Sequence, residues 1–143
     1  MIANKCGHIV TVSSVQGRLA IPFRSAYAAS KHALQAFMDT TRAELARDNI
    51  AVTVISPGYV STNLSLNAMT GDGSNYGRMD ETTKSGMSPL ACATAIYEAI
   101  VNQDKEVVLA PLAHRLMIAV RVLWPWLYFL VMRMRAKPGK KRE

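Results

Sequence analysis

Cysteine and histidine are scarce in this sequence, and their positions exclude two classes of site. Cys6 and Cys92 are the two cysteines, and they stand 86 positions apart without a Cys-x-x-Cys spacing or a neighbouring pair of histidines. Neither a zinc site nor a disulfide framework is therefore expected. We interpret both cysteines as free, buried thiols in a reducing compartment, and we expect no metal cofactor.

Charge is also scarce, and its excess lies at one end. Charged residues make up 19% of the 143 residues and apolar residues 50%, which is enough to bury one core. Residues 1–113 hold nine basic and nine acidic residues, whereas residues 114–143 hold eight basic residues and one acidic. The tail therefore carries the whole net charge of +7. A neutral body without a basic stripe argues against nucleic acid as a partner, and a basic, apolar tail favours an anionic membrane surface.

A glycine-rich turn that could bind phosphate is missing. Such a turn follows a strand and opens a helix. Gly71, Gly73 and Gly77 form a cluster, but they follow no strand and open no helix, so we interpret them as a turn within a lid. Residues 1–7 do not resemble a signal peptide, because they are short, mixed and followed at once by a strand-like run.

Apolar runs predict an alternation of strands and helices. Residues 8–12 are β-branched and apolar, as in a strand buried on both faces. Residues 25–47 contain no Gly or Pro and show a three- and four-residue repeat, which predicts a helix with Ser25 as its cap. Residues 51–55 predict a second strand. The order strand, helix, strand favours parallel pairing in an α/β layer fold.

The second half of the chain alternates less regularly. Residues 59–87 are polar and have no sustained period, which is typical of a functional lid. Ser88 and Pro89 then predict the cap and first residue of a helix that ends near residue 102. Residues 106–110 predict a short third strand.

Polar side chains are predicted to meet at the carboxyl ends of the strands. Tyr27 and Lys31 are four residues apart on a helix, so they share a face, and an ammonium close to a phenol stabilises the phenolate. A phenol in this setting can act as a general acid or base. Ser14 follows the first strand and Pro57-Gly58 follows the second, at the edge where ligands gather in open α/β sheets.

These motifs together resemble the short-chain dehydrogenase/reductase family. The shared pattern is an apolar strand, Ser-Ser, thirteen positions from Ser14 to Tyr27, Tyr-x-x-x-Lys, a strand and Pro-Gly-x-Val-x-Thr. The resemblance implies an α/β fold, the C-terminal part of a Rossmann-like doubly wound parallel sheet, with the N-terminal βαβ dinucleotide-binding half absent from this sequence. Residues 1–110 would form this partial domain, and residues 111–143 an apolar and basic helix or tail.

The resemblance also implies roles for single residues. Tyr27 would protonate a carbonyl oxygen, or remove a proton in the reverse reaction. Lys31 would stabilise the Tyr27 phenolate and hydrogen-bond the nicotinamide ribose. Ser14 would bind the substrate oxygen. The cofactor would be bordered by Pro57, Gly58, Val60 and Thr62, together with Tyr27 and Lys31.

A narrower resemblance concerns membrane-associated members of the family. It rests on residues 23–33, 54–59 and 63–65. It implies interconversion of a ketone and a secondary alcohol on an apolar, lipid-like or steroid-like substrate, which would place the protein in lipid metabolism. NADP(H) is expected rather than NAD(H). The endoplasmic reticulum is the expected location, with the peroxisome as the alternative, and a homodimer is expected through the Tyr27 helix.

The tail leaves two interpretations open. Residues 116–132 are apolar except for Arg121 and contain Pro125, so they fall short of the roughly 20 apolar residues of a spanning helix. Aromatic residues followed by basic ones make residues 116–142 resemble an interfacial anchor on a membrane surface. The alternative is a C-terminal helix that packs over the substrate site or against a second subunit.

The activity of the chain by itself is open as well. Under the first hypothesis it belongs to an oxidoreductase that uses Ser14, Tyr27 and Lys31. Under the alternative it is a truncated isoform or fragment that retains these residues but cannot bind a dinucleotide. Such a chain would have at most a role in dimerisation or in membrane interaction.

Overall fold

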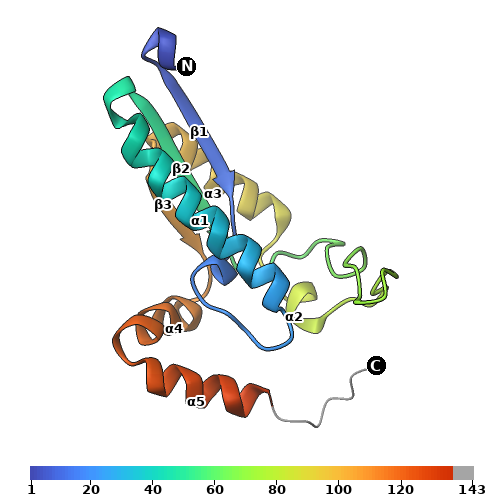
Figure 1. Ribbon diagram of the computed structural model, residues 1–143. Helices are drawn as coiled ribbons and strands as arrows, with labels where there is room; N and C mark the ends of the chain where they lie inside the picture. Colours follow the sequence, from blue (N-terminus) through green and yellow to red (C-terminus); the bar gives the residue numbers. More distant parts are fainter. Residues whose placement is uncertain (137–143) are drawn as a thin grey trace.

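The computed structural model describes residues 1–136 of the chain, and these residues form a parallel sheet with helices on both faces (Figure 1). The three strands of this part are β1 (Gly7–Val12), β2 (Ile50–Pro57) and β3 (Glu106–Leu109), paired in the order β1-β2-β3. Both pairs are parallel. The helices are α1 (Ser25–Leu45), α2 (Glu81–Lys84), α3 (Pro89–Asn102), α4 (Leu112–Leu123) and α5 (Pro125–Arg135). The predicted α/β class with a parallel sheet is confirmed.

The core lies between α1 and the central strand. Met38 of α1 packs against Val52 and Val54 of β2, with Ile9 and Leu34 at the edge of the cluster. These residues are apolar at the helical spacing in α1 and β-branched in β2, as burial between two layers requires. The central strand β2 is therefore the element around which the fold is built.

The prediction that the first strand is buried on both faces is wrong. The residues of β1 are half-buried, and Val12 is 50% exposed. The reason is position: within residues 1–136, β1 lies at an edge of the sheet, and α3 packs mainly on β2 and β3. The apolar run in β1 therefore indicates that these residues favour a strand. It does not indicate that both faces of the strand are buried.

The helix ends confirm one predicted cap and correct another. Ser88 caps α3, since its hydroxyl oxygen accepts a hydrogen bond from the Ala91 N–H at 3.2 Å, and Pro89 is the first helical residue. Ser25 does not cap α1, because it is already the first residue of that helix. The preceding Arg24 is the N-cap and provides no capping side-chain hydrogen bond.

The tail divides into two helices. Trp124 leaves the helical conformation (φ −134°, ψ 66°), and Pro125, which has no N–H to donate, begins α5. No helix within residues 1–136 is both long and apolar enough to cross a membrane. The predicted anchor at residues 116–142 also includes basic residues that lie outside the described part of the chain, namely Lys137, Lys140, Lys141 and Arg142.

The two cysteines lie in different surroundings. Both are free, as predicted, but Cys6 is exposed in the segment before β1, whereas Cys92 is buried on α3. The prediction of two buried thiols is therefore wrong for Cys6. Burial raises the pKa of the Cys92 thiol above its ordinary value.

Candidate active site

Tyr27 and Lys31 lie in the first turns of α1 and face the carboxyl end of β1. The Lys31 ammonium is 5.8 Å from the centre of the Tyr27 ring, and it donates a hydrogen bond to the Val12 carbonyl oxygen at 3.4 Å. Tyr27 is 37% exposed, and its hydroxyl has no hydrogen-bond partner within residues 1–136. The predicted pair is thus brought together at the end of the first strand, with the phenol available to a ligand.

Ser14 is buried where the chain leaves β1. Its hydroxyl oxygen accepts a hydrogen bond from the Gln16 N–H at 3.1 Å and caps the 3₁₀ turn Val15–Gly17. The hydroxyl proton of Ser14 is not donated to any residue of the described chain, so it can be donated to a substrate oxygen. The neighbouring Ser13 hydroxyl is also buried and has no partner there.

Gly17 lies in the loop that follows Ser14, and the structure gives it a positioning role. A Cβ atom on Gly17 would lie 2.8 Å from the carbonyl oxygen of Lys31. The loop after Ser14 therefore touches the backbone of α1 directly, and only glycine allows this approach. The spacing of Ser14, Tyr27 and Lys31 alone carries no signal for this contact.

Pro57 and Gly58 end β2 beside the end of β1. The two strand ends are joined by a hydrogen bond from the Ser13 N–H to the Ile55 carbonyl oxygen at 2.7 Å. Gly58 donates its N–H to the Leu109 carbonyl oxygen at 2.8 Å, and a Cβ atom there would lie 3.2 Å from the Ala110 Cβ. A side chain at position 58 would therefore crowd Ala110 at the end of β3.

Val60 and Thr62 lie in the predicted lid, whose two ends meet. Val60 pairs with Met87, and the Thr62 hydroxyl is exposed, with only long local contacts at 3.4 and 3.5 Å. Within residues 1–136, neither Val60 nor Thr62 makes a hydrogen bond to Tyr27 or Lys31. The structure therefore brings Ser14, Tyr27, Lys31 and the end of β2 together, and it leaves Val60 and Thr62 at the base of the lid.

An ion pair connects the lid to the start of α1. Arg24, immediately before α1, donates to the carboxylate of Asp80 at 2.9 Å. Asp80 is also the N-cap of α2 and accepts a hydrogen bond from Tyr76 at 3.3 Å. Figure 1 shows α2 and the lid beside the first turns of α1. The ion pair thus attaches the lid to Arg24, which stands three positions before Tyr27 in the sequence.

The helix α5 packs over the loop that joins Ser14 to Tyr27. Tyr128 is 2% exposed, and its hydroxyl accepts a hydrogen bond from the Ala20 N–H at 3.0 Å and donates one to the Ala20 carbonyl oxygen. This contact holds α5 against that loop.

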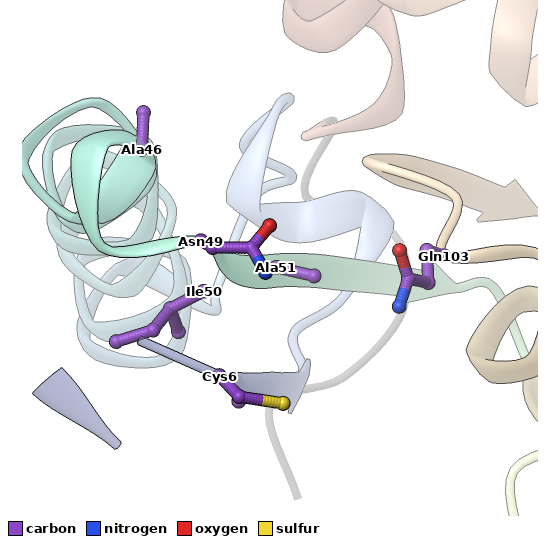
Figure 2. A pocket seen from close by; sticks show the side chains of 7 residues that line it. Cys6, Ala46, Asn49, Ile50, Ala51 and Gln103 are labelled. Atoms are coloured by element: carbon purple, nitrogen blue, oxygen red, sulfur yellow. The ribbon is translucent and has the colours of Figure 1, made fainter. Parts of the chain in front are cut away.

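A shallow hollow lies at the opposite end of the sheet. It has a volume of about 230 Å³ and is bordered by Cys6, Asn49, Ala51 and Gln103 (Figure 2). These residues stand at the amino ends of the strands, whereas ligands of open α/β sheets bind at the carboxyl ends. Within residues 1–136, no group of three or more His, Cys, Asp or Glu side chains could hold a metal ion.

The donors at the strand ends fit one half of a dinucleotide. The Lys31 ammonium and the buried Ser13 hydroxyl can donate hydrogen bonds, which suits the hydroxyls of a ribose. Within residues 1–136, no glycine-rich turn joins a strand to a following helix, so nothing in this part fits the pyrophosphate.

The comparison with known families decides the classification. The sequence profile described as short chain dehydrogenase matches residues 1–72, just over half of the 143 residues. This chain belongs to the short-chain dehydrogenase family. The Dehydrogenase/reductase SDR family protein 7-like of Anopheles gambiae is 56% identical to it over 137 residues, and the Dehydrogenase/reductase SDR family member 7B of Bos taurus is 54% identical over 143.

This short-chain dehydrogenase chain spans less than half the length of those relatives. The alignments cover 96% and 100% of the chain but only 43% and 44% of the Anopheles and Bos proteins. The narrower resemblance inferred from residues 23–33, 54–59 and 63–65 agrees with these matches.

Solved structures of other short-chain dehydrogenases share the fold of this chain. A short chain dehydrogenase/reductase from Burkholderia phymatum in complex with NAD superposes with a TM-score of 0.69 at 20% identity, over 100% of this chain and 54% of that one. One from Burkholderia cenocepacia in complex with NADP has a TM-score of 0.63 at 19% identity, over 92% and 48%. At such identities the likeness establishes the fold alone, and it confirms the Rossmann-like prediction.

Proposed function

We propose that this chain forms the catalytic part of an NAD(P)(H)-dependent oxidoreductase that interconverts a ketone and a secondary alcohol. The observation that carries the proposal is the placement of the Lys31 ammonium 5.8 Å from the Tyr27 ring, at the end of β1 where Ser14 is buried. A phenol, an ammonium and a hydroxyl donor in this arrangement suit proton transfer to a carbonyl oxygen.

Each of these side chains has a separate task. Ser14 donates its free hydroxyl proton to the carbonyl oxygen and stabilises the negative charge that develops there. Tyr27 transfers its phenolic proton to the same oxygen, which completes the alcohol. Lys31 stabilises the phenolate that remains, because its positive charge lies beside the ring. The reverse reaction uses the same groups with Tyr27 as the base.

The cofactor proposed is a nicotinamide dinucleotide. When bound, it would supply the hydride that adds to the carbonyl carbon. Lys31 would hold its ribose, and Pro57 and Gly58 would border its ring. Support comes from two structural neighbours, one in complex with NAD and one in complex with NADP. NADP(H) remains our prediction, because the neighbours include both.

An apolar substrate is proposed on the basis of the surroundings of the site. Phe23 in the loop before α1 is 72% exposed, and Leu64 and Met69 in the lid are 65% and 76% exposed. Exposed apolar side chains on segments next to a site are typical of surfaces that close on an apolar ligand. This supports a lipid-like or steroid-like ketone.

The test is the Tyr27→Phe variant. Because the chain spans less than half of its relatives, the assay uses this sequence joined to the part of the Bos taurus relative that it does not match. NADPH and NADH consumption is followed with a panel of apolar ketones. We expect Tyr27→Phe to lower kcat by about 10²–10⁴-fold, the usual contribution of a general acid. Tyr97→Phe is the matched control, since Tyr97 is 67% exposed on α3 and far from the site in sequence. Near-normal turnover of Tyr27→Phe would contradict the assignment.

A second proposal, of a different class, is a chain that dimerises without binding cofactor. It is supported by the outer side of α1, where Ala29, Ala33 and Ala36 are exposed beside Phe37, which is 64% exposed. Small side chains there would allow the close approach of a second helix. Sedimentation of the 143-residue chain with and without Ala33→Glu tests the dimer. Tight binding of NADPH by the same chain would contradict the non-catalytic alternative.

A further inference from the structure

The two sides of α5 differ sharply in exposure. Tyr128 faces the fold and is 2% exposed, whereas Trp126, Phe129 and Leu130 are 66%, 56% and 46% exposed. In a helix, Trp126 and Leu130 lie two positions from Tyr128 and therefore on roughly the opposite side, whereas Phe129 lies on the flank between them. Since α5 is fixed to the loop by Tyr128 on one side, its apolar outer side is presented to the surroundings.

The helix α4 continues this surface. Leu112, Leu116 and Leu123 are 68%, 57% and 63% exposed, and their spacing of four and seven places them on one stripe of the helix. The helix packs against α5, and the two lie side by side in Figure 1. We name the whole the α4–α5 surface; it comprises Leu112, Leu116, Val122, Leu123, Trp124, Trp126, Phe129, Leu130 and Met134, all exposed.

An exposed arginine of α4 contacts two aromatic rings of α5. The Arg121 guanidinium of α4 lies 5.4 Å from the ring centres of both Tyr128 and Phe129 on α5. Such contacts between a cation and aromatic rings are favourable. The two helices that carry the α4–α5 surface are therefore in contact with each other.

The charge around this surface selects its partner. From Val107 to Arg142 the sequence contains eight basic residues and no acidic one. Among the described ones, Arg133 and Arg135 lie in the last turn of α5, and Arg115 lies on the exposed stripe of α4. A second copy of the chain would bring the same positive charge to the interface, which is repulsive. A partner that combines an apolar interior with a negatively charged boundary is complementary to the α4–α5 surface.

We propose that the α4–α5 surface binds the interface of an anionic phospholipid membrane, with both helices lying in the plane of the interface. The helices have 12 and 11 residues, so each is about 18 Å long or less and cannot cross a hydrocarbon layer of about 30 Å. Tryptophan prefers the level of the lipid headgroups, and arginine pairs there with phosphate. The proposal does not depend on the dehydrogenase chemistry.

Both tryptophans of the chain, Trp124 and Trp126, belong to this surface, so their fluorescence reports on it alone. The 143-residue chain is titrated with vesicles of phosphatidylcholine, and with vesicles that also contain phosphatidylserine. We expect the emission to shift to shorter wavelength, at a lower lipid concentration with phosphatidylserine. Lipids brominated near the top of the acyl chain should quench the emission, because interfacial helices lie about 5–10 Å deep.

Variants separate the apolar and the charged contributions. Leu116→Glu with Leu130→Glu keeps both tryptophans and should abolish vesicle binding. Arg133→Gln with Arg135→Gln should weaken binding to the phosphatidylserine vesicles about fivefold per arginine and leave binding to phosphatidylcholine unchanged. Circular dichroism verifies that each variant folds.

The matched control is Leu90→Glu with Tyr97→Glu on α3, where the side chains are 78% and 67% exposed. It should bind vesicles as the unchanged chain does. The proposal is overturned if neither type of vesicle shifts the emission, or if the control loses as much binding as Leu116→Glu with Leu130→Glu. It is also overturned if the shift occurs without lipid and follows dimer formation in sedimentation, because the occupant would then be a second copy.

Discussion

Gly17 lies against the backbone of Lys31, so that a Cβ atom at position 17 would come within 2.8 Å of the Lys31 carbonyl oxygen. The same atom would lie 2.9 Å from the Ser13 hydroxyl oxygen. The loop that follows Ser14 is thus seated on the turn of α1 that carries Lys31. The contact joins the backbone at Gly17 to the backbone at Lys31. The relative position of Ser14 and the Tyr27–Lys31 pair therefore does not depend on flexible side chains.

Gly17→Ala should therefore destabilise the chain and displace this loop. The added methyl group meets a backbone oxygen that cannot move without shifting α1, so we expect the free energy of unfolding to fall by about 1–3 kcal/mol. Urea unfolding measures it. Gly71→Ala is the control, because a Cβ atom at Gly71 meets nothing within 4 Å and should change stability little. Equal stability of the two variants would contradict the packing described.

Tyr128→Phe tests the contact between α5 and the loop before α1. The variant loses the hydrogen bonds that Tyr128 makes with the N–H and the carbonyl oxygen of Ala20. We expect a loss of about 1–2 kcal/mol in the free energy of unfolding. Amide hydrogen exchange should accelerate in residues 18–24. Tyr97→Phe, at an exposed position of α3, should leave both measurements unchanged.

The ion pair between Arg24 and Asp80 is expected to hold the lid, with a small contribution to stability. Its side chains are 40% and 24% exposed, so solvent screens the pair. A double-mutant cycle with Arg24→Ala and Asp80→Asn should give a coupling of about 0.2–1 kcal/mol that shrinks with added salt. Limited proteolysis should cut the lid faster in either variant. The same cycle on the Arg42–Asp39 pair of α1, 2.8 Å apart, should leave lid cleavage unchanged.

Acid should loosen the turn at the tip of the lid. Hydrogen bonds from the Thr70 hydroxyl, and then from the N–H and hydroxyl of Ser74, lower the pKa of Asp72 from 3.8 to about 2. A lowered pKa means that the ionised carboxylate stabilises the turn at pH values above 3.8 and that this contribution is lost as the pH falls toward 2. NMR titration of the Ser74 amide should follow Asp72. Asp72→Asn should abolish this titration, and a midpoint near 4 in the unchanged chain would contradict the prediction.

The membrane location at the endoplasmic reticulum, the identity of the ketone and the preference for NADP(H) stay predictions. They concern molecules that bind the protein, and none of them follows from the fold, which many enzymes with different substrates share. The vesicle titration and the ketone panel address them separately.

Much of the fold could be predicted because it depends on short-range patterns. The apolar runs at residues 8–12 and 51–55 became β1 and β2, and Ser88 with Pro89 began α3 as predicted. The four-residue step from Tyr27 to Lys31 was enough to place both side chains on one face of a helix. Each of these features is decided by residues within a few positions of one another.

Contacts between distant segments were decided only by the tertiary structure. Tyr128 meets Ala20 across 108 positions, and nothing in either local sequence indicates the other. The close approach of Gly17 to Lys31 and the exposure of β1 likewise depend on which elements pack together. The sequence by itself determined the elements and the spacing of the catalytic types of residue, since backbone preferences and periodicity act locally. Packing decided how the loop, the lid and α5 surround them, since burial and hydrogen bonding depend on all the segments that meet in space.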